Sequence, residues 1–264
     1  VITALTAQTT AGVEAVVATP ASHVARTLRA LRDDLGPPSA LKIGMLCDAD
    51  IAGAVADFLD DDADRETDHL FVVVDPVLVS TSGRRLLDDA GEKVLKERVL
   101  PRASLVTPNA REAERLLGLD PFAIRSVADL RDACTALCQA FPGTAFLVKG
   151  GHLDEEENEE EEEDEEETVR RKGTDALGFY NERDTTTNDD SSKRDEVVVR
   201  FLSSPAVLET DGPKGGVHGT GCVLASAVAA AVARGEPLLD AICVAKALCA
   251  ETISTSLRRF DRGA

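Results

Sequence analysis

Hydrophobic runs alternate with amphipathic segments along most of the 264-residue chain. Apolar residues at helical spacing predict helices over 24–35, 51–59, 84–98, 110–117, 127–138, 220–234 and 238–258. Shorter apolar runs predict strands over 40–46, 69–77, 104–107, 145–149, 175–180, 196–202 and 206–209. Continuous apolar strands separated by helices are typical of a mostly parallel sheet covered on both faces. The pattern therefore predicts a single α/β domain over residues 1–264.

Polar or glycine-containing turns follow several of these predicted strands. Ligands of such sheets bind beyond the carboxyl ends of the strands, so we expect the site at these turns. The turns contain Leu46, Asp75-Pro76, Thr107-Pro108-Asn109 and Lys149-Gly150-Gly151.

A glycine-rich turn at residues 216–222, Gly-Val-His-Gly-Thr-Gly-Cys, opens directly into a predicted helix. The N–H groups of a first helical turn and the positive end of the helix dipole favour phosphate at such a place. The same field favours a thiolate at Cys222. The pattern indicates chemistry on a phosphate, although a glycine turn before a buried small residue is the alternative.

The net charge of −19 is concentrated in one segment. Residues 154–167 hold 13 acidic side chains among 14, and leaving them out changes −19 to −6. Like charges repel and too few apolar residues are present to form a core, so we expect 154–195 to be a largely disordered insertion. An acidic protein-binding or calcium-binding segment is the alternative.

Composition excludes several classes of protein. No run of about 18 apolar residues predicts a membrane span, and no basic patch favours nucleic acid. The six cysteines show neither a Cys-x-x-Cys pair nor zinc-ligand spacing, which predicts reduced thiols in a reducing compartment, the cytoplasm. Cys134 and Cys138 fall four apart on a predicted helix, which favours core packing over metal binding.

Seven blocks in a fixed order resemble the hydroxymethylpyrimidine/phosphomethylpyrimidine kinases of thiamine biosynthesis, within the ribokinase-like superfamily. The likeness covers nearly the whole chain outside the acidic insertion, and it implies a three-layer α/β/α sandwich. The blocks are Ile2-Thr-Ala-Leu-Thr-Ala-Gln-Thr9, Lys42-Ile-Gly-Met-Leu46, Asp75-Pro-Val-Leu-Val-Ser-Thr-Ser-Gly83, Leu100-Pro-Arg-Ala103, Thr107-Pro-Asn-Ala-Arg-Glu-Ala113, Leu147-Val-Lys-Gly-Gly-His152 and His218-Gly-Thr-Gly-Cys222.

The resemblance implies ATP-dependent phosphorylation of the pyrimidine's hydroxymethyl group and then of the monophosphate, with Mg²⁺ as the accompanying ion. It implies that the backbone of Gly219, Thr220 and Gly221 stabilises the transferred phosphoryl group, and that Cys222 takes the hydroxyl proton. Such a reaction depends on positioning and charge neutralisation. A thiol whose pKa is lowered at a helix N-terminus can act as a base near neutral pH.

The resemblance also assigns the nucleotide and metal ligands. Lys149 suits the ATP phosphates as a point charge, with Thr107, Asn109 and His218 as further nucleotide contacts. Glu112 and Asp75 offer oxygens to Mg²⁺. Asn109 and Glu112 also fit a capping box, in which both side chains bond only to the start of a helix.

The resemblance places Gln8, Thr6 and Met45 at the pyrimidine. Members of the family normally begin with a strand and an Asp-Ser-Ser-Gly-Gly-Ala-Gly segment, whereas this sequence starts after it. We therefore expect the phosphate half of the site to be whole and the substrate half to be incomplete. The alternatives are a pyridoxal-type kinase of the same fold and a truncated non-catalytic homologue, and a homodimer is an open alternative to a monomer.

Overall fold

The computed structural model describes residues 1–9, 12–63, 70–80, 83–151, 173–180, 196–203 and 219–260. The chain groups into two compact units. Unit 1 comprises Val1–Ala103 and Val207–Ala264, and unit 2 comprises Ser104–Ala206. The expectation of a single domain over residues 1–264 stays a prediction.

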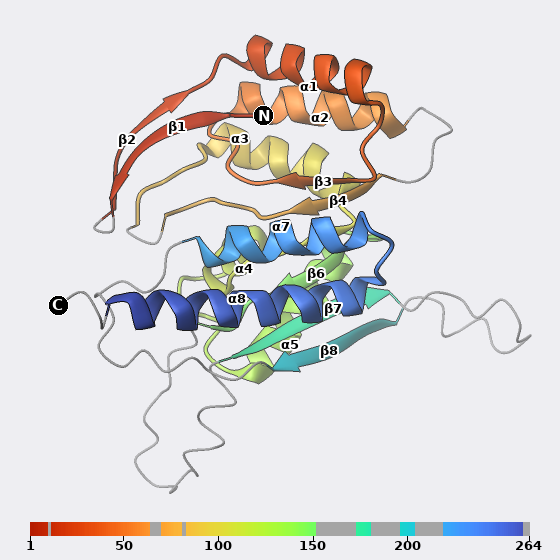
Figure 1. Cartoon of the computed structure of the whole chain (residues 1–264). Helices are drawn as coiled ribbons and strands as arrows, with labels where there is room; N and C mark the ends of the chain where they lie inside the picture. Colours follow the sequence, from red (N-terminus) through yellow and green to blue (C-terminus); the bar gives the residue numbers. More distant parts are fainter. Residues whose placement is uncertain are drawn as a thin grey trace, which may run out of the picture. The chain divides into compact units, whose positions relative to one another are not determined.

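Unit 1 contains two parallel strands, β3 (Ala40–Ile43) and β4 (Phe71–Val74), paired from Ala40↔Phe71 to Ile43↔Val74. Helix α7 (Thr220–Val232) packs on both strands and on α8 (Leu238–Phe260), while α1 (Ala21–Leu35) packs on α2 (Ala49–Ala63) (Figure 1). These elements confirm the helices predicted over 24–35, 51–59, 220–234 and 238–258 and, with shorter bounds, the strands predicted over 40–46 and 69–77. Helix α1 ends at Gly36, whose φ of +79° is in the left-handed region that favours glycine.

An antiparallel hairpin at the start of unit 1 was not predicted from the sequence. It pairs β1 (Ala4–Thr9) with β2 (Gly12–Ala18), with an irregularity between Ala7 and Gln8. Neither strand contains a fully buried residue, and Leu5 and Val17 are well exposed. Without a buried face, the hairpin lacks the regular apolar alternation by which a strand is recognised.

The helix predicted over 84–98 begins later, and residues 84–88 correct that prediction. They make single β-bridges instead, between Val79 and Arg85 and between Cys47 and Leu87. The Asp88 carboxylate accepts the Gly91 N–H at 2.6 Å, which fixes the start of the helix at the next residue. The helical segment then runs through α3 (Asp89–Val94), the π-helical η1 (Leu95–Val99) and the 3₁₀ turn η2 (Leu100–Arg102).

The described residues of unit 2 form four strands in the order β5 (Leu105–Val106), β6 (Ala145–Val148), β7 (Thr174–Tyr180) and β8 (Val197–Ser203). The β5–β6 pair is parallel, but β6–β7 and β7–β8 are antiparallel, so the sheet is mixed. Helix α4 (Ala110–Leu117) packs on α5 (Val127–Ala140), and α5 covers β6, β7 and β8. The strand predicted over 206–209 and most of the 154–195 insertion lie outside the described residues.

Two buried thiols of α5 pack directly against β7. The Cys134 thiol donates to the carbonyls of Phe146 and Ala176 at 3.4 and 3.3 Å. A Cβ at Gly178 would lie 2.8 Å from the Cys134 sulfur and 2.9 Å from the Cys138 sulfur, so the strand approaches closely only because it has glycine there. The hydrogen bond with Cys138, together with burial, raises the pKa of Cys134. These contacts confirm the predicted packing role.

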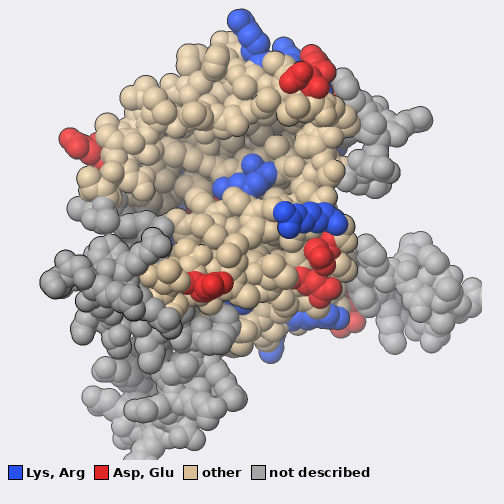
Figure 2. Space-filling model, in the orientation of Figure 1, with Lys and Arg blue, Asp and Glu red and all other residues tan. Residues whose placement is uncertain are grey.

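The described parts of the chain include no helix long and apolar enough to cross a membrane. On the face drawn in Figure 2, Lys and Arg side chains are scattered among Asp, Glu and a large uncharged surface.

Candidate active site

Helix α7 begins at the glycine-rich turn that the sequence singled out. Its N-cap is Gly219, with φ +88° and ψ 0°, a conformation that L side chains rarely adopt. Thr220, Gly221 and Cys222 form the first turn, and Val223 donates the first helical hydrogen bond, to the Gly219 carbonyl at 3.0 Å. The N–H groups of this turn are not used in the helix's own hydrogen bonds and form the positive end of its dipole. The turn therefore has the geometry of an anion-binding helix terminus.

Cys222 is exposed in that first turn. Most of the other described cysteines are in different surroundings: Cys134 and Cys138 are buried, and Cys47 is half-buried. Burial raises the pKa of the Cys47 thiol, and the carboxylates of Asp48 and Asp88 raise it further. Cys47 is therefore protonated near neutral pH, whereas Cys222 lies where the helix dipole favours a thiolate. His218, one residue before the N-cap, lies outside the described residues.

Asp75 follows β4 and is only 3% exposed. Its N–H donates to the Ile43 carbonyl at 2.9 Å, which extends the parallel pairing beyond the ends of the strands. The Lys42 ammonium lies 4.0 Å from the Asp75 carboxylate, and Gly44 leaves room for it, since a Cβ there would be 2.6 Å from that nitrogen. Sequence reasoning assigned no role to Lys42, although a lysine within an apolar strand is a signal for a charge partner.

The three residues expected at the pyrimidine lie on two segments of unit 1. Thr6 and Gln8 are in β1, and the Thr6 hydroxyl donates to the Gln8 amide oxygen at 3.4 Å. Met45 follows β3, and its carbonyl accepts the Thr3 hydroxyl at 2.6 Å. The structure therefore ties the beginning of the chain to the Met45 turn through Thr3.

In unit 2, the ends of β5 and β6 bring two expected nucleotide ligands together. Asn109 and Lys149 form a parallel bridge, and the Lys149 N–H donates to the Pro108 carbonyl at 2.8 Å. Thr107, the residue before Pro108, is completely buried. Backbone hydrogen bonds, independent of side-chain conformation, therefore hold Lys149 beside the start of α4.

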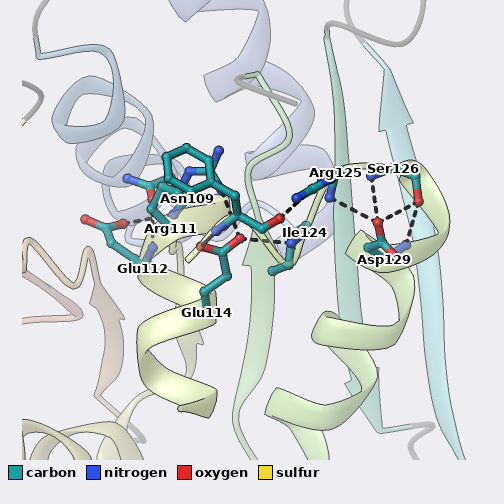
Figure 3. Close-up of polar contacts among 9 residues, drawn as sticks. Asn109, Arg111, Glu112, Glu114, Ile124, Arg125, Ser126 and Asp129 are labelled. Carbon is teal, nitrogen blue, oxygen red and sulfur yellow. Dashed lines mark hydrogen bonds and ion pairs between the residues drawn. The ribbon is translucent and has the colours of Figure 1, made fainter. Parts of the chain in front are cut away.

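Asn109 and Glu112 form the capping box that the sequence left as an alternative (Figure 3). The Asn109 side chain accepts the Glu112 N–H, and the Glu112 carboxylate accepts the Asn109 N–H, each at 2.9 Å. Glu112 is 7% exposed. Because a carboxylate has two oxygens and several lone pairs, capping does not by itself exclude a metal contact. Among the described residues, however, no three His, Cys, Asp or Glu side chains gather as a metal site.

A second buried carboxylate in α4 orders the loop that leads to α5. Glu114 is 3% exposed and accepts the N–H groups of Phe122 and Ile124 at 3.1 and 2.9 Å. Arg111 pairs with Glu114 at 3.0 Å (Figure 3). The Arg111 guanidinium also lies over the Phe122 ring, 3.6 Å from its centre. These contacts hold the 118–126 loop against α4, the helix that Asn109 caps. No sequence pattern signals these contacts, because loop-to-helix contacts do not follow a period.

Known proteins resemble this chain over nearly its whole length. A family model for phosphomethylpyrimidine kinase matches residues 1–263. The chain is 34% identical over 261 residues to the hydroxymethylpyrimidine/phosphomethylpyrimidine kinase of Rhizobium meliloti, covering 98% of this chain and 80% of that protein. It is 36% identical over 246 residues to the thiamine biosynthesis bifunctional protein ThiED of Geobacter sulfurreducens, covering 93% of this chain and 41% of that protein. It thus spans about two-fifths of that longer relative.

Solved structures share the fold. The phosphomethylpyrimidine kinase of Clostridium difficile 630 matches with a TM-score of 0.66 and 27% identity, covering 96% of this chain and 84% of that one. The pyridoxal kinase of Staphylococcus aureus in complex with AMP-PCP also has a TM-score of 0.66, at 23% identity, covering 96% of this chain and 76% of that one. These matches confirm the predicted α/β class of ribokinase-like kinases. Together with the family match, they show that the chain belongs to the phosphomethylpyrimidine kinase family.

Proposed function

We propose that this chain transfers the γ-phosphoryl group of ATP to the hydroxymethyl group of 4-amino-5-hydroxymethyl-2-methylpyrimidine, and then phosphorylates the monophosphate to the diphosphate. The observation that supports this most directly is the start of α7, where a glycine N-cap is followed by an exposed cysteine in the first turn. The curated relatives named as kinases of the same two pyrimidines support the choice of substrate.

In the proposed reaction, the substrate hydroxyl oxygen attacks the γ-phosphorus as the bond to ADP breaks. The Cys222 thiolate takes the hydroxyl proton, and the backbone N–H groups of Gly219, Thr220 and Gly221 stabilise the charge on the transferred oxygens. Because the Cys222 thiol is exposed, a substrate can reach it without any displacement of buried side chains. The dipole of α7 favours both the thiolate before transfer and the phosphoryl oxygens during it.

The proposed nucleotide ligands are Lys149, Asn109, Thr107 and His218. Lys149 supplies a positive charge to the phosphates, and its backbone is fixed by Pro108. The buried carboxylates of Glu112 and Asp75 provide the hard oxygen donors that suit Mg²⁺, which usually takes one or two carboxylates together with substrate phosphates. When bound with ATP, that ion would neutralise phosphate charge.

Gln8 would recognise the aminopyrimidine edge through its amide, with Thr6 beside it and Met45 as an apolar contact to the ring. The hydrogen bond between Thr6 and Gln8 supports this assignment, because it orients the amide oxygen. The amide nitrogen would then be directed toward an acceptor of the ring.

A pyridoxal-type kinase is the second candidate, since solved pyridoxal kinases share this fold. The two functions are separated by measuring kcat/KM with ATP for the hydroxymethylpyrimidine and for pyridoxal. We expect the pyrimidine to be preferred at least about tenfold, a difference of roughly 1.4 kcal/mol in transition-state stabilisation. A preference for pyridoxal would overturn the proposed substrate. Turnover of neither would favour a non-catalytic homologue.

A further inference from the structure

The turn after β6 is tied to a buried carboxylate on the neighbouring strand. The Gly150 N–H donates to the Asp175 carboxylate at 3.0 Å, across 25 residues of sequence. Asp175 is 7% exposed. The regular pairing of β6 with β7 ends at Val148↔Ala176, so this side-chain contact takes over where the backbone ladder stops.

Gly150 can make this approach only because it has no side chain. A Cβ there would lie 2.2 Å from the Thr174 carbonyl oxygen and 2.6 Å from a methyl carbon of Leu130. Contacts shorter than 3.0 Å with backbone do not occur for real Cβ atoms. The turn is therefore held between α5 and the first residues of β7, with the Asp175 carboxylate as its polar anchor.

Two hydrogen bonds hold the backbone on either side of the Lys149 side chain. On one side its own N–H donates to the Pro108 carbonyl at 2.8 Å, and on the other side the next N–H, that of Gly150, donates to Asp175. Because the peptide between Lys149 and Gly150 is planar, fixing both N–H groups fixes the backbone on either side of the Lys149 Cα. The direction in which the Lys149 side chain leaves the backbone is thereby set.

We propose that Asp175 is a positioning residue for Lys149, acting through the Gly150 peptide to hold the lysine where a nucleotide phosphate can reach it. This inference rests on the proposed function, which assigns Lys149 to the nucleotide. In this proposal Asp175 acts through the Gly150 peptide and not by contact with the nucleotide. Its effect on binding therefore depends on the presence of the lysine ammonium group.

Two substitutions separate the hydrogen bond from the charge of Asp175. Asp175→Asn keeps an oxygen that can accept the Gly150 N–H, whereas Asp175→Leu has a similar volume and no acceptor. Ser126→Ala is the matched control, since it removes the N-cap of α5 in the same unit without touching the turn. Each is introduced into the 264-residue chain, and the dissociation constant of AMP-PCP, a non-hydrolysable ATP analogue, is measured by calorimetry.

We expect Asp175→Leu to weaken binding of the analogue about tenfold, since a hydrogen bond to a charged group is lost. Asp175→Asn and Ser126→Ala should stay within about twofold of the unsubstituted chain. In a Lys149→Met background, Asp175→Leu should change binding by less than about twofold, because coupled residues are not additive. An equal loss in both backgrounds would mean a merely structural role and would overturn the proposal.

Hydrogen exchange of the Gly150 amide tests the anchor without any nucleotide. The amide should exchange more slowly in the unsubstituted chain and in Asp175→Asn than in Asp175→Leu. If Asp175→Leu does not fold, Asp175→Asn decides alone: weakening of about tenfold or more, with an unchanged Tm, overturns the proposal. An unsubstituted chain that binds no analogue contradicts the proposed function, whereas equal Gly150 exchange in all folded variants contradicts only the anchor.

Discussion

Asn109 and Glu112 cap each other at the start of α4, each side chain accepting the other residue's backbone N–H at 2.9 Å. The pair thus has a complete structural role before any ion is considered. A capping box needs an oxygen at its third helical position, and glutamine supplies one as well as glutamate does. The negative charge of Glu112 adds only a small interaction with the helix dipole, whereas binding of a metal ion depends on it.

This difference gives a test of the metal assignment. Glu112→Gln should keep the Tm of the chain but increase the Mg²⁺ concentration needed for half-maximal activity. Glu112→Ala should in addition lower the free energy of unfolding by about 1 kcal/mol, the usual effect of losing a cap. If Glu112→Gln leaves the Mg²⁺ dependence unchanged, Glu112 serves α4 only.

The capping box of α5 predicts a pH-dependent stability. Hydrogen bonds from the Arg125 N–H and from Ser126 hold the pKa of Asp129 below its usual value of 3.8. A carboxylate whose folded-state pKa is lowered stabilises the fold above its unfolded pKa, and the effect is lost as the pH falls through the folded value. Asp129→Asn should therefore reduce stability most above about pH 5 and progressively less below about pH 3. Denaturant unfolding across this range measures the difference, and a pH-independent difference would contradict the explanation.

Replacing glycine by alanine should have opposite effects on the free energy of unfolding at two positions. Gly178→Ala should lower the free energy of unfolding by about 1–3 kcal/mol, because its Cβ would meet the sulfurs of Cys134 and Cys138. Gly53→Ala, in the middle of α2 with no atom within 4 Å of the added Cβ, should raise it by about 0.5–1 kcal/mol. In a Cys134→Ala background the cost of Gly178→Ala should shrink. Equal costs in both backgrounds would show that the sulfurs are not responsible.

Residues 154–167 should be dispensable for folding. They fall between β6 and β7, whose pairing from Phe146↔Gly178 to Val148↔Ala176 already holds the two strands together. Because the cost of closing a loop changes slowly with its length, replacement of the run by a few Gly and Ser residues should leave the Tm within a few degrees. A larger decrease, measured by calorimetry, would mean that the acidic run packs on the rest of the chain.

The sequence predicted those elements whose residues follow a strong period or carry clear end signals. Helix α4 was predicted with its observed bounds, and the structure has Asn109 as its N-cap and Gly118 as its C-cap. The β1–β2 hairpin was missed because neither strand has a buried face. The helical start at Asp89 was placed too early, since residues 84–88 pair with distant segments that no local pattern reveals.

In the candidate site, too, the features with a local sequence signal could be predicted and those that depend on distant contacts could not. The start of α7 could be predicted because glycine, helix and cysteine are adjacent in the sequence. Lys42 and Asp175 could not be predicted, because their partners Asp75 and Gly150 lie in the turns after other strands. Long-range polar pairs of this kind are decided by strand order and register.

The single-turnover rate of phosphoryl transfer in Cys222→Ser tests most directly whether the start of α7 is the reaction centre. The measurement uses ATP and the hydroxymethylpyrimidine, with the dissociation constant of ATP determined in parallel and with the exposed Cys243 replaced by Ser as the matched control. We predict a rate lowered by about 10²–10⁴-fold for Cys222→Ser, with ATP binding and the control nearly unchanged. A Cys222→Ser rate equal to that of the unsubstituted chain would contradict the account and leave Cys222 as an ordinary surface thiol.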